Sequence, residues 1–367
     1  MDPVIPARLQ SENIYHFRME HANTIVNRLA YYNNKFRHSV IWYPSNKFLG
    51  VWDGMTYTFS RPSNATLGPD IGRLPMDILY TILENIDIRS LITFRQLNLE
   101  ARHIVDSIPH GKYRRVIEHA YILLRALFLT QSELAAKISL VDLDTALCTA
   151  ACAICGEFSG FISIPTWKRC CYSCLQRAPE LRMQSLAGAK KDFGLTKSQL
   201  DQLSLFQALP GRYTLKDPPL KLKRYEHTIV SIHQAAIISG RPPHPVPPWK
   251  QYFNENYMAS CPLPFYDRRG DSHVVESGLS CLGCYYARSQ NKNVATIEKD
   301  VTAEKLYTTD GFLRHFQRCE QAQRLWEMIE AGKELPKALQ VIWGAGFEEP
   351  REYRYLSRRP ALVGDIM

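Results

Sequence analysis

The sequence contains no long uninterrupted apolar run. Its longest largely apolar stretch, residues 116–129, includes Glu118, His119 and Arg125, and it falls short of the roughly 20 residues that a membrane-spanning helix needs. The opening residues 1–6 have no basic flank followed by an apolar core, which excludes a secretory signal. We therefore expect a chain of the cytoplasm or nucleus that has no membrane partner.

The motifs of common enzyme classes are also missing. The sequence has no glycine-rich phosphate-binding loop of either kind, no G-x-S-x-G elbow and no H-E-x-x-H pair. Each of these motifs places a reactive group or a phosphate in a fixed geometry, and nothing in the chain replaces them. We therefore predict no catalytic residues and expect a non-catalytic protein.

Runs of like charge are absent as well. The 367 residues include 45 Lys and Arg against 36 Asp and Glu, a formal net charge of +9, and the basic residues are spread along the chain. We interpret this charge as a solvated surface and do not expect nucleic acid as a partner. With 45% hydrophobic residues, the chain is long enough for about two domains with a real core.

Cysteine, by contrast, is plentiful. Ten cysteines in a reducing compartment should carry free thiols, so their spacing points to metal before disulfides. Four of them follow the pattern C-x2-C-x15-C-x2-C: Cys152, Cys155, Cys171 and Cys174. Each pair offers two thiolates to one tetrahedral ion, and residues 158–164 and 166–169 have the composition of a hairpin between the pairs. We predict a structural Zn2+ site with a closed coordination sphere; the alternative is four buried or unpaired thiols.

Two neighbouring cysteines are interpreted differently. We expect Cys148 and Cys170 to be core residues, although Cys170 competes with Cys171 for the same ligand position. A ubiquitin ligase of the RING type is excluded because the four-cysteine set has no histidine, and the next cysteine pair lies too far along the chain to interleave with it. The four-cysteine set is therefore expected to be a self-contained module.

A second metal-ligand pattern is more widely spaced. Its members are Cys281, Cys284, His315 and Cys319. Residues 310–331 are helical in pattern, and a histidine and a cysteine four apart lie on the same face of a helix. We predict a second Zn2+ site of three cysteines and one histidine. The alternative is a satisfied core histidine beside packing cysteines.

The stretch Leu74–Asn98 has the pattern of short amphipathic helices. Pro75 suits a first helical turn because it has no N–H to leave unpaired. The apolar positions that follow recur at helical period: Ile78, Leu79, Ile82, Leu83 and Ile86. Asp87 breaks this run, Ser90 is a suitable N-cap for a second helix, and a third helix is predicted over residues 99–109. About 35 residues bury little surface alone, so the unit should either dock on a partner or form part of a larger core.

At these residues the chain resembles the F-box family, in the variant form of many fungal F-box proteins. The matching positions are Leu74-Pro75, Ile78-Leu79, Ile82-Leu83, Asp87, Ser90-Leu91, Phe94-Arg95, Asn98 and Arg102. The resemblance implies that the segment binds the Skp-type adaptor of a cullin-RING ubiquitin ligase. The residues that it implies face the adaptor are Leu74, Pro75, Ile78, Leu79, Leu83, Leu91 and Leu97. The order of motifs over residues 70–330 also resembles one whole-chain fungal F-box family.

The other segments complete the expected architecture. Residues 39–43, 47–52 and 55–59 have the composition of short strands, the last two joined by Asp53-Gly54, and predict an aromatic meander that either packs on a neighbour or binds a partner. Helices are predicted over residues 13–28, 112–129, 132–139 and 197–203. We divide the chain into an N-terminal extension with a β-hairpin (1–70), the F-box (71–112), linker helices (113–147), the four-cysteine module (148–180), a helical region (181–240), a proline-rich connector (241–260), the second zinc module (261–335) and a basic tail (336–367).

The expected fold is therefore mainly α with small β elements. It comprises an N-terminal aromatic β-meander, a three-helix F-box, a zinc-ribbon-like four-cysteine module and a helical C-terminal region. The expected function is a substrate-recognition adaptor that binds a Skp-type subunit, through it a cullin, and an unidentified protein substrate. The alternative is a zinc-dependent protein that binds nucleic acid or other proteins without a ligase role, because the zinc knuckle and following Leu195-Thr196 helix also resemble damage-recognition domains of excision repair.

Overall fold

The computed structural model describes residues 14–33, 36, 39–41, 66–130, 133–209, 213, 228–243, 255–269, 274–290, 304–336 and 339. They fall into two compact units. The terminal unit comprises Met1–Tyr32 with Leu279–Phe347, and the central unit comprises Asn33–Gly278 with Glu348–Met367. The expected mainly helical chain with small sheets is confirmed. Most of the meander predicted over residues 39–59, most of the proline-rich connector and most of the basic tail lie outside the described residues. The part of the first predicted strand that is described, residues 39–41, is not in a strand.

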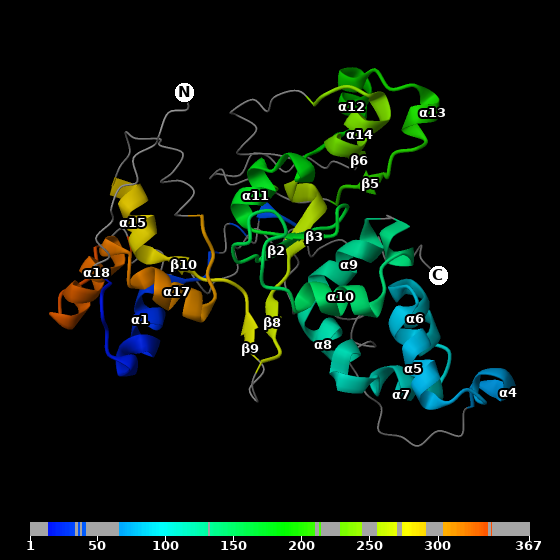
Figure 1. Cartoon of the computed structure of the whole chain (residues 1–367), viewed down its shortest axis with the longest axis horizontal. Helices are drawn as coiled ribbons and strands as arrows, with labels where there is room; N and C mark the ends of the chain where they lie inside the picture. Colours follow the sequence, from blue (N-terminus) through cyan, green and yellow to red (C-terminus); the bar gives the residue numbers. More distant parts are fainter. Residues whose placement is uncertain are drawn as a thin grey trace, which may run out of the picture. The chain divides into compact units, whose positions relative to one another are not determined.

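The central unit begins with a layer of short helices (Figure 1). These helices are α4 (Gly68–Ile71), α5 (Met76–Asn85), α6 (Ile88–Arg95), α7 (Leu99–Asp106), α8 (Lys112–His119), α9 (Tyr121–Leu129) and α10 (Leu140–Leu147), with 3-10 turns at Pro109–Gly111 and Glu133–Ala136. Three short helices, α5 to α7, thus occupy the stretch predicted for them. Their inner faces supply fully buried residues such as Ile88, Leu91 and Val105 to the core.

Local capping explains where α6 and α7 begin. The Asp87 carboxylate accepts a hydrogen bond from the backbone N–H of Ser90 at 2.9 Å, and the Asn98 side chain accepts one from Ala101 at 2.8 Å. Asp87 is therefore the N-cap of α6, and the prediction of Ser90 was wrong. Both residue types are strong caps, but Ser90 lies inside α6, where its hydroxyl donates to the Asp87 carboxylate at 2.6 Å.

The helices after α7 differ from the prediction in two places. The expected continuous helix over residues 112–129 is interrupted at Ala120, whose φ of −108° lies outside the helical range. The stretch expected to be helical over residues 132–139 forms only a 3-10 turn over Glu133–Ala136. Ser139 then starts α10 through a reciprocal capping box with Asp142. Strong local capping explains why a new helix starts here rather than the preceding one continuing.

Small antiparallel sheets form the rest of the central unit. One has the order β3-β2-β7 and another the order β4-β6-β5, and β8 pairs with β9. Their strands are β2 (Phe161–Ser163), β3 (Lys168–Cys170), β4 (Met183–Ser185), β5 (Phe206–Gln207), β6 (Thr228–Ser231), β7 (Ser260–Pro262), β8 (Phe265–Asp267) and β9 (Val274–Glu276). The hairpin predicted between the two cysteine pairs is confirmed as β2–β3, in which Phe161 lies opposite Cys170.

Helices accompany both three-stranded sheets. They are α11 (Tyr172–Arg177), α12 (Leu186–Phe193), α13 (Lys197–Leu200) and α14 (Ile232–Ser239), with 3-10 turns at Pro179–Leu181 and Tyr257–Ala259. A capping box between Thr196 and Gln199 starts α13, but the helix predicted over residues 197–203 ends at Leu200. Phe193, Val230 and Ala235 are buried in a small core of their own between α12, β6 and α14.

The terminal unit joins segments from distant parts of the sequence. Its elements are a 3-10 turn at Met19–His21, α1 (Ala22–Leu29), β1 (Ala30–Tyr31), β10 (Ser280–Cys281), α15 (Leu282–Gln290), α17 (Thr309–Phe316) and α18 (Glu320–Glu330). β1 pairs antiparallel with β10. Ile25 and Leu29 of α1 are fully buried against the helices that follow β10, so the segment near the N-terminus is part of this core. The helix predicted over residues 13–28 is found in shorter form as α1.

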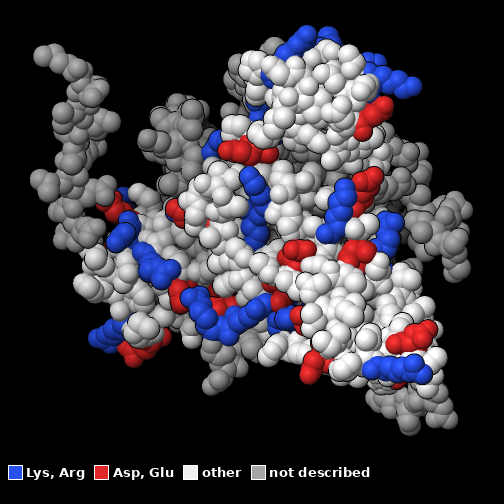
Figure 2. Space-filling view, turned by 45° about the vertical axis from the view of Figure 1, so that its right-hand side comes forward, with Lys and Arg blue, Asp and Glu red and all other residues white. Residues whose placement is uncertain are grey.

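The surface charges and the helix lengths bear on two further features of the chain. Basic and acidic side chains are interspersed over the face shown in Figure 2, as expected for a solvated surface. Among the described residues, none of the helices combines the length and the apolar composition needed to cross a membrane.

Candidate metal centres and an exposed helix face

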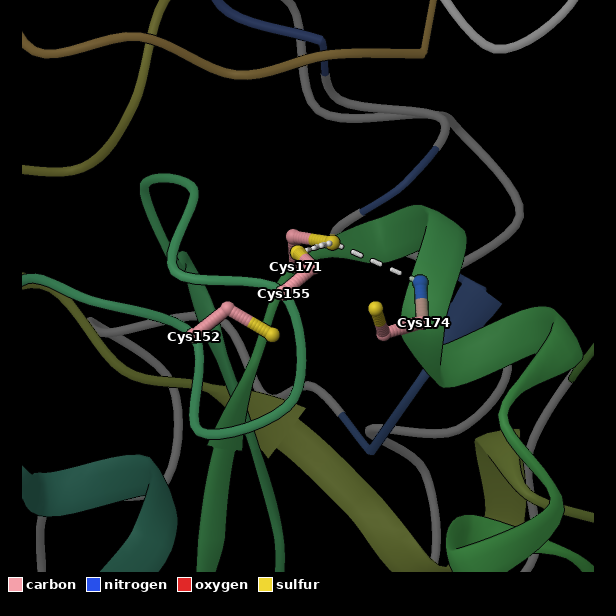
Figure 3. Close-up of side chains that lie close together, drawn as sticks. All are labelled: Cys152, Cys155, Cys171 and Cys174. Atoms are coloured by element: carbon pink, nitrogen blue, oxygen red, sulfur yellow. Dashed lines mark hydrogen bonds between the residues drawn. The ribbon is translucent and has the colours of Figure 1, made fainter. Parts of the chain in front are cut away.

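The first candidate centre brings together the four cysteines predicted from their spacing. The Sγ atoms of Cys152, Cys155, Cys171 and Cys174 all lie within 4.8 Å of one another. The first two stand in the turn before β2, Cys171 is the N-cap of α11, and Cys174 lies in its first turn. In Figure 3 the four side chains converge from these two elements on one point. The set could therefore hold one metal ion.

Backbone hydrogen bonds hold the two cysteine pairs in place. The N–H of Gly156 donates to the Cys152 carbonyl at 2.9 Å, and Gly156 adopts φ +76°, which closes the first turn without a Cβ penalty. The N–H of Ala153 donates to the Arg169 carbonyl at 2.9 Å, which ties this turn to β3. Because Cys171 follows directly after β3, the hairpin brings Cys171 and Cys174 close to the first cysteine pair.

The sulfur geometry excludes disulfides and favours a shared cation. Cys155 Sγ lies 3.6 Å from Cys171 Sγ, far beyond the ~2.05 Å of a disulfide bond, and all ten cysteines are free. A hydrogen bond with Cys171 lowers the pKa of Cys152 to about 4, and the same bond raises the pKa of Cys171. The sulfurs lie close enough to share a proton, and a bound cation would take the place of that proton.

The two neighbouring cysteines stay outside this centre. Cys170 on β3 is fully buried, and burial raises the pKa of its thiol. Cys148, which is half-buried at the end of α10, has its pKa raised first by burial and then by the Asp144 carboxylate. Neither belongs to the group of converging sulfurs, so Cys171 rather than Cys170 occupies the ligand position.

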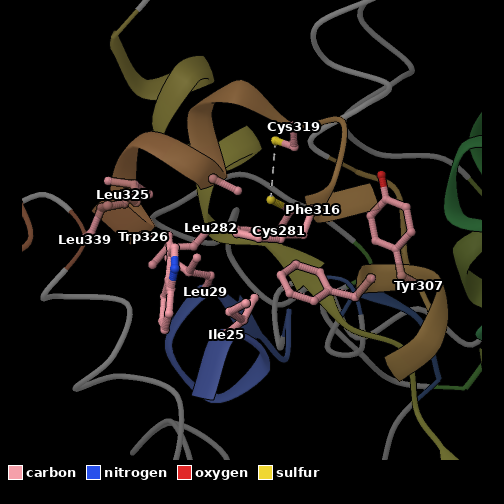
Figure 4. Packing of buried hydrophobic residues seen from close by; sticks show 12 residues of the cluster. Ile25, Leu29, Cys281, Leu282, Tyr307, Phe316, Cys319, Leu325, Trp326 and Leu339 are labelled. Carbon is pink, nitrogen blue, oxygen red and sulfur yellow. Dashed lines mark hydrogen bonds between the residues drawn. The ribbon is translucent and has the colours of Figure 1, made fainter. Parts of the chain in front are cut away.

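The second candidate centre lies within the terminal unit. Its ligand atoms, which also lie within 4.8 Å of one another, belong to Cys281, Cys284, His315 and Cys319. Cys281 Sγ is 3.9 Å and Cys284 Sγ 3.8 Å from Cys319 Sγ, and Cys284 Sγ is 3.3 Å from Nε2 of His315. Figure 4 shows Cys281 and Cys319 facing each other, with Ile25 and Leu29 of α1 below them and Leu325 and Trp326 of α18 to the side. This set could hold a second metal ion.

The last two ligands of the second centre come from two helices rather than from one. His315 and Cys319 do not share one helix face, because the helix predicted over residues 310–331 is divided into α17 and α18. Cys319 is the N-cap of α18, and the chain turns between the two ligands. Hydrogen bonds with Cys281 and then Cys284 lower the pKa of Cys319. Hydrogen bonds with Cys284 and then Cys319 raise the pKa of Cys281.

A glycine between the first two ligands permits close helix packing. A Cβ on Gly283 would lie 2.4 Å from the backbone N and 2.7 Å from the Cα of Ala322. Both atoms belong to the backbone of α18, three residues after Cys319. Gly283 is therefore required for α15 and α18 to approach, and with them the ligands that they carry.

We expect Gly283→Ala to loosen the second centre. The added methyl must push α18 away, which should lower the free energy of unfolding by about 1–3 kcal/mol and weaken metal retention at this centre alone. Denaturant unfolding and metal analysis check this, with Gln290→Ala at the exposed end of α15 as the control. Full metal retention and an unchanged free energy of unfolding in Gly283→Ala would contradict it.

Two contributions to the second centre were not predicted. Residues 1–38 were assigned no role, yet β1 pairs with the strand that carries Cys281, Ala30 lying opposite it. The Tyr307 hydroxyl lies 3.2 Å from Nδ1 of His315. The eight-residue spacing between Tyr307 and His315 matches no known motif. The pairing of Ala30 with Cys281 joins residues some 250 positions apart, so no local sequence pattern indicates it.

The residues implied to face an adaptor divide into two groups. Leu79, Leu83 and Leu91 are 5%, 2% and 0% exposed. They pack inside the chain's own core, so their assignment to a partner surface is corrected.

The other predicted residues lie on the surface. Leu74 is 39%, Ile78 is 50% and Leu97 is 63% exposed, and Pro75 is also exposed. Ile82, one turn after Ile78 on α5, is 43% exposed. The helix is thus apolar on two neighbouring sides. We call the exposed set, Ile78 and Ile82 of α5 with Leu74 just before its N-cap, the α5 outer face.

Comparisons of the chain with models of known protein families, with curated proteins and with solved structures found no match. The residues of the chain and their geometry are therefore the basis on which its function is proposed.

Proposed function

We propose that the chain is the substrate-recognition subunit of a Skp, cullin and F-box ubiquitin ligase, in which α5, α6 and α7 bind the Skp-type adaptor. The observation that carries the proposal is the α5 outer face. Its three large apolar side chains recur at helical spacing and remain 39–50% exposed, whereas Leu79 and Leu83 on the neighbouring side of α5 are buried. Clustered exposed apolar residues on one helix face are typical of a protein–protein interface.

The anchoring of these helices supports the same role. Lys112 Nζ of α8 lies 2.6 Å from the Glu84 carboxylate of α5. The buried Arg95 of α6 pairs with Asp106 of α7 at 2.8 Å. The N–H of Ile88 donates to the Ile138 carbonyl at 2.8 Å, which joins α6 to the start of α10. An adaptor bound to α5 would therefore be held in a fixed orientation to the helices that follow.

Both metal centres fit zinc by the chemistry of their donors. Thiolates about 2.3 Å from a tetrahedral Zn2+ lie ~3.8 Å apart, and the sulfur pairs are separated by 3.6, 3.8 and 3.9 Å. Four protein ligands at each centre would leave no coordination position for water or a substrate. The zinc ions would therefore be structural, and the zinc-stabilised region would present a surface to a protein substrate while ubiquitin transfer is supplied in trans through the cullin.

We expect the double variant Ile78→Asp/Ile82→Asp to lose adaptor binding. Two carboxylates buried against an apolar partner surface have no compensating charge, so affinity should fall at least ~100-fold. The test is co-purification of a Skp-type adaptor with the full chain, followed by titration. Ile237→Asp is the matched control, because Ile237 of α14 is 69% exposed and lies away from α5 in the sequence.

Zinc content and helical signal should be the same in all of these chains. Binding that is unchanged in the double variant, or a wild-type chain that binds no Skp-type adaptor, would refute the proposed function. Identification of the proteins that accompany the adaptor complex would then define the substrate.

A further inference from the structure

The second centre depends on a histidine whose ring must be turned correctly. Imidazole can bind a metal through either nitrogen, and the nitrogen that binds is set by the hydrogen bond that the other one makes. Nε2 of His315 lies 3.3 Å from Cys284 Sγ, among the sulfurs. Nδ1 faces the Tyr307 hydroxyl at 3.2 Å. The geometry of the ring therefore distinguishes the two nitrogens.

We propose that Tyr307 is a positioning residue for this centre, whose phenol oxygen accepts a hydrogen bond from Nδ1–H of His315 and leaves Nε2 as the metal ligand. The inference rests on the proposed zinc at this centre. An outer partner of this kind fixes both the tautomer and the orientation of the ring. The ligand that His315 offers is therefore a neutral imidazole that binds the metal through Nε2.

Tyr307 is itself held firmly enough to do this. Its backbone N–H donates to the Leu279 carbonyl at 2.9 Å and its carbonyl accepts from the Leu279 N–H at 2.8 Å. Leu279 stands two residues before Cys281, so the same backbone pair holds Tyr307 and the strand that carries the first ligand. The Tyr307 side chain is 8% exposed, which restricts its movement.

Ring packing adds a second restraint on the histidine. The Tyr307 and His315 rings stack with centroids 4.5 Å apart and planes 20° from parallel. Removal of the hydroxyl alone would keep this stacking. Tyr307→Phe therefore separates the hydrogen bond from the packing, and the fold of the terminal unit should survive it.

The test measures zinc affinity in the full chain by competition with a chelator of known affinity. We expect Tyr307→Phe to raise the dissociation constant of the second centre about 10–100-fold and to leave that of the four-cysteine centre unchanged. Tyr285→Phe is the control, since it removes a hydroxyl from the same unit at a ring that packs on Tyr31. If the wild-type chain holds two zinc ions and Tyr307→Phe binds zinc at the second centre with the same affinity, the role of Tyr307 is overturned. The proposed second zinc would then still stand.

A spectroscopic readout separates positioning from general stability. Long-range ¹H–¹⁵N correlation spectra of the histidine rings should show His315 protonated at Nδ1 and metal-bound at Nε2, and the Nδ1 proton should exchange faster with water in Tyr307→Phe. Coordination through Nδ1 in the wild-type chain would overturn the proposal. A wild-type chain that holds zinc only at the four-cysteine centre would instead refute the proposed second zinc, and the inference with it.

Discussion

Cys171→Ser is expected to abolish metal binding at the four-cysteine centre, so that the chain retains one zinc ion where the wild type holds two. The loss follows from the geometry, because Cys171 Sγ is the sulfur that faces Cys155 at 3.6 Å. Structural zinc contributes on the order of 10–16 kcal/mol of apparent binding energy coupled to folding. The free energy of unfolding of the central unit should therefore fall by several kcal/mol.

The choice of serine isolates the effect of the metal. Cys171 is also the N-cap of α11, and its Sγ accepts a hydrogen bond from the Cys174 N–H at 3.4 Å. Serine is one of the preferred N-cap residues, so helix capping survives the substitution while a thiolate ligand is lost. Any loss of stability in Cys171→Ser can therefore be assigned to the lost metal ligand and not to a lost helix cap.

Metal analysis and denaturant unfolding of the purified chain give the two readouts. Cys148→Ser is the matched control, because Cys148 is a half-buried cysteine outside the cluster, and it should retain both zinc ions. An unchanged zinc content in Cys171→Ser would show that Cys171 is not a ligand. A zinc content reduced by one without any loss of stability would show that the metal does not support the fold.

The two centres differ in how far the sequence could predict them. The four-cysteine centre depends on two short turns and one hairpin, and each of these leaves a local pattern in the sequence. In the second centre the ligands were correctly grouped by type, but the supporting helix was not, because a single apolar stripe over residues 310–331 hides the turn between α17 and α18. The pairing of Ala30 with Cys281 is a contact between distant segments, which periodicity does not encode.

The helix α5 illustrates a different limit. Its apolar residues occupy two sides, and periodicity alone does not tell which side a chain buries in its own core. The structure resolves this by placing Leu79 and Leu83 inside and Ile78 and Ile82 outside. The exposed pair is then more informative about a partner than the buried pair, because large apolar side chains clustered on one exposed helix face are typical of a protein–protein interface.

The interior of the central unit contains a charged residue that the sequence did not single out. Arg169 on β3 is 4% exposed, and its guanidinium donates to carbonyl oxygens rather than to a carboxylate. These acceptors include the carbonyls of Ala146, Leu263 and Pro264, each at 2.9 Å. Ala146 belongs to α10, and the other two connect β7 to β8. One side chain therefore joins three segments of the unit around the hairpin of the four-cysteine centre.

Burial lowers the pKa of Arg169 to about 10, which leaves the side chain charged at neutral pH. A guanidinium has five N–H donors and is suited to several acceptors at once. The Ser159 hydroxyl also accepts from its Nε at 2.8 Å. Removal of the guanidinium would leave these buried acceptors without their donor, and an unsatisfied buried polar group costs about 1–3 kcal/mol.

Arg169→Met is therefore expected to lower the free energy of unfolding of the central unit by about 3 kcal/mol or more. Because the Arg169 carbonyl also accepts from the Ala153 N–H in the first cysteine turn, displacement of β3 should weaken zinc retention at the four-cysteine centre. Denaturant unfolding and chelator competition measure the two effects. Arg114→Met is the control, since Arg114 is exposed and forms a surface pair with Glu118 worth about 0.3–0.5 kcal/mol.

Arg169→Lys provides the decisive comparison. Lysine keeps the charge but offers three donors from a single nitrogen, which cannot reach acceptors on three separate segments. It should therefore recover little of the lost stability, whereas a need for charge alone would be met by either side chain. Near-complete recovery in Arg169→Lys, or a loss below ~1 kcal/mol in Arg169→Met, would contradict the role of this guanidinium as the connector of α10, the hairpin and the β7–β8 link.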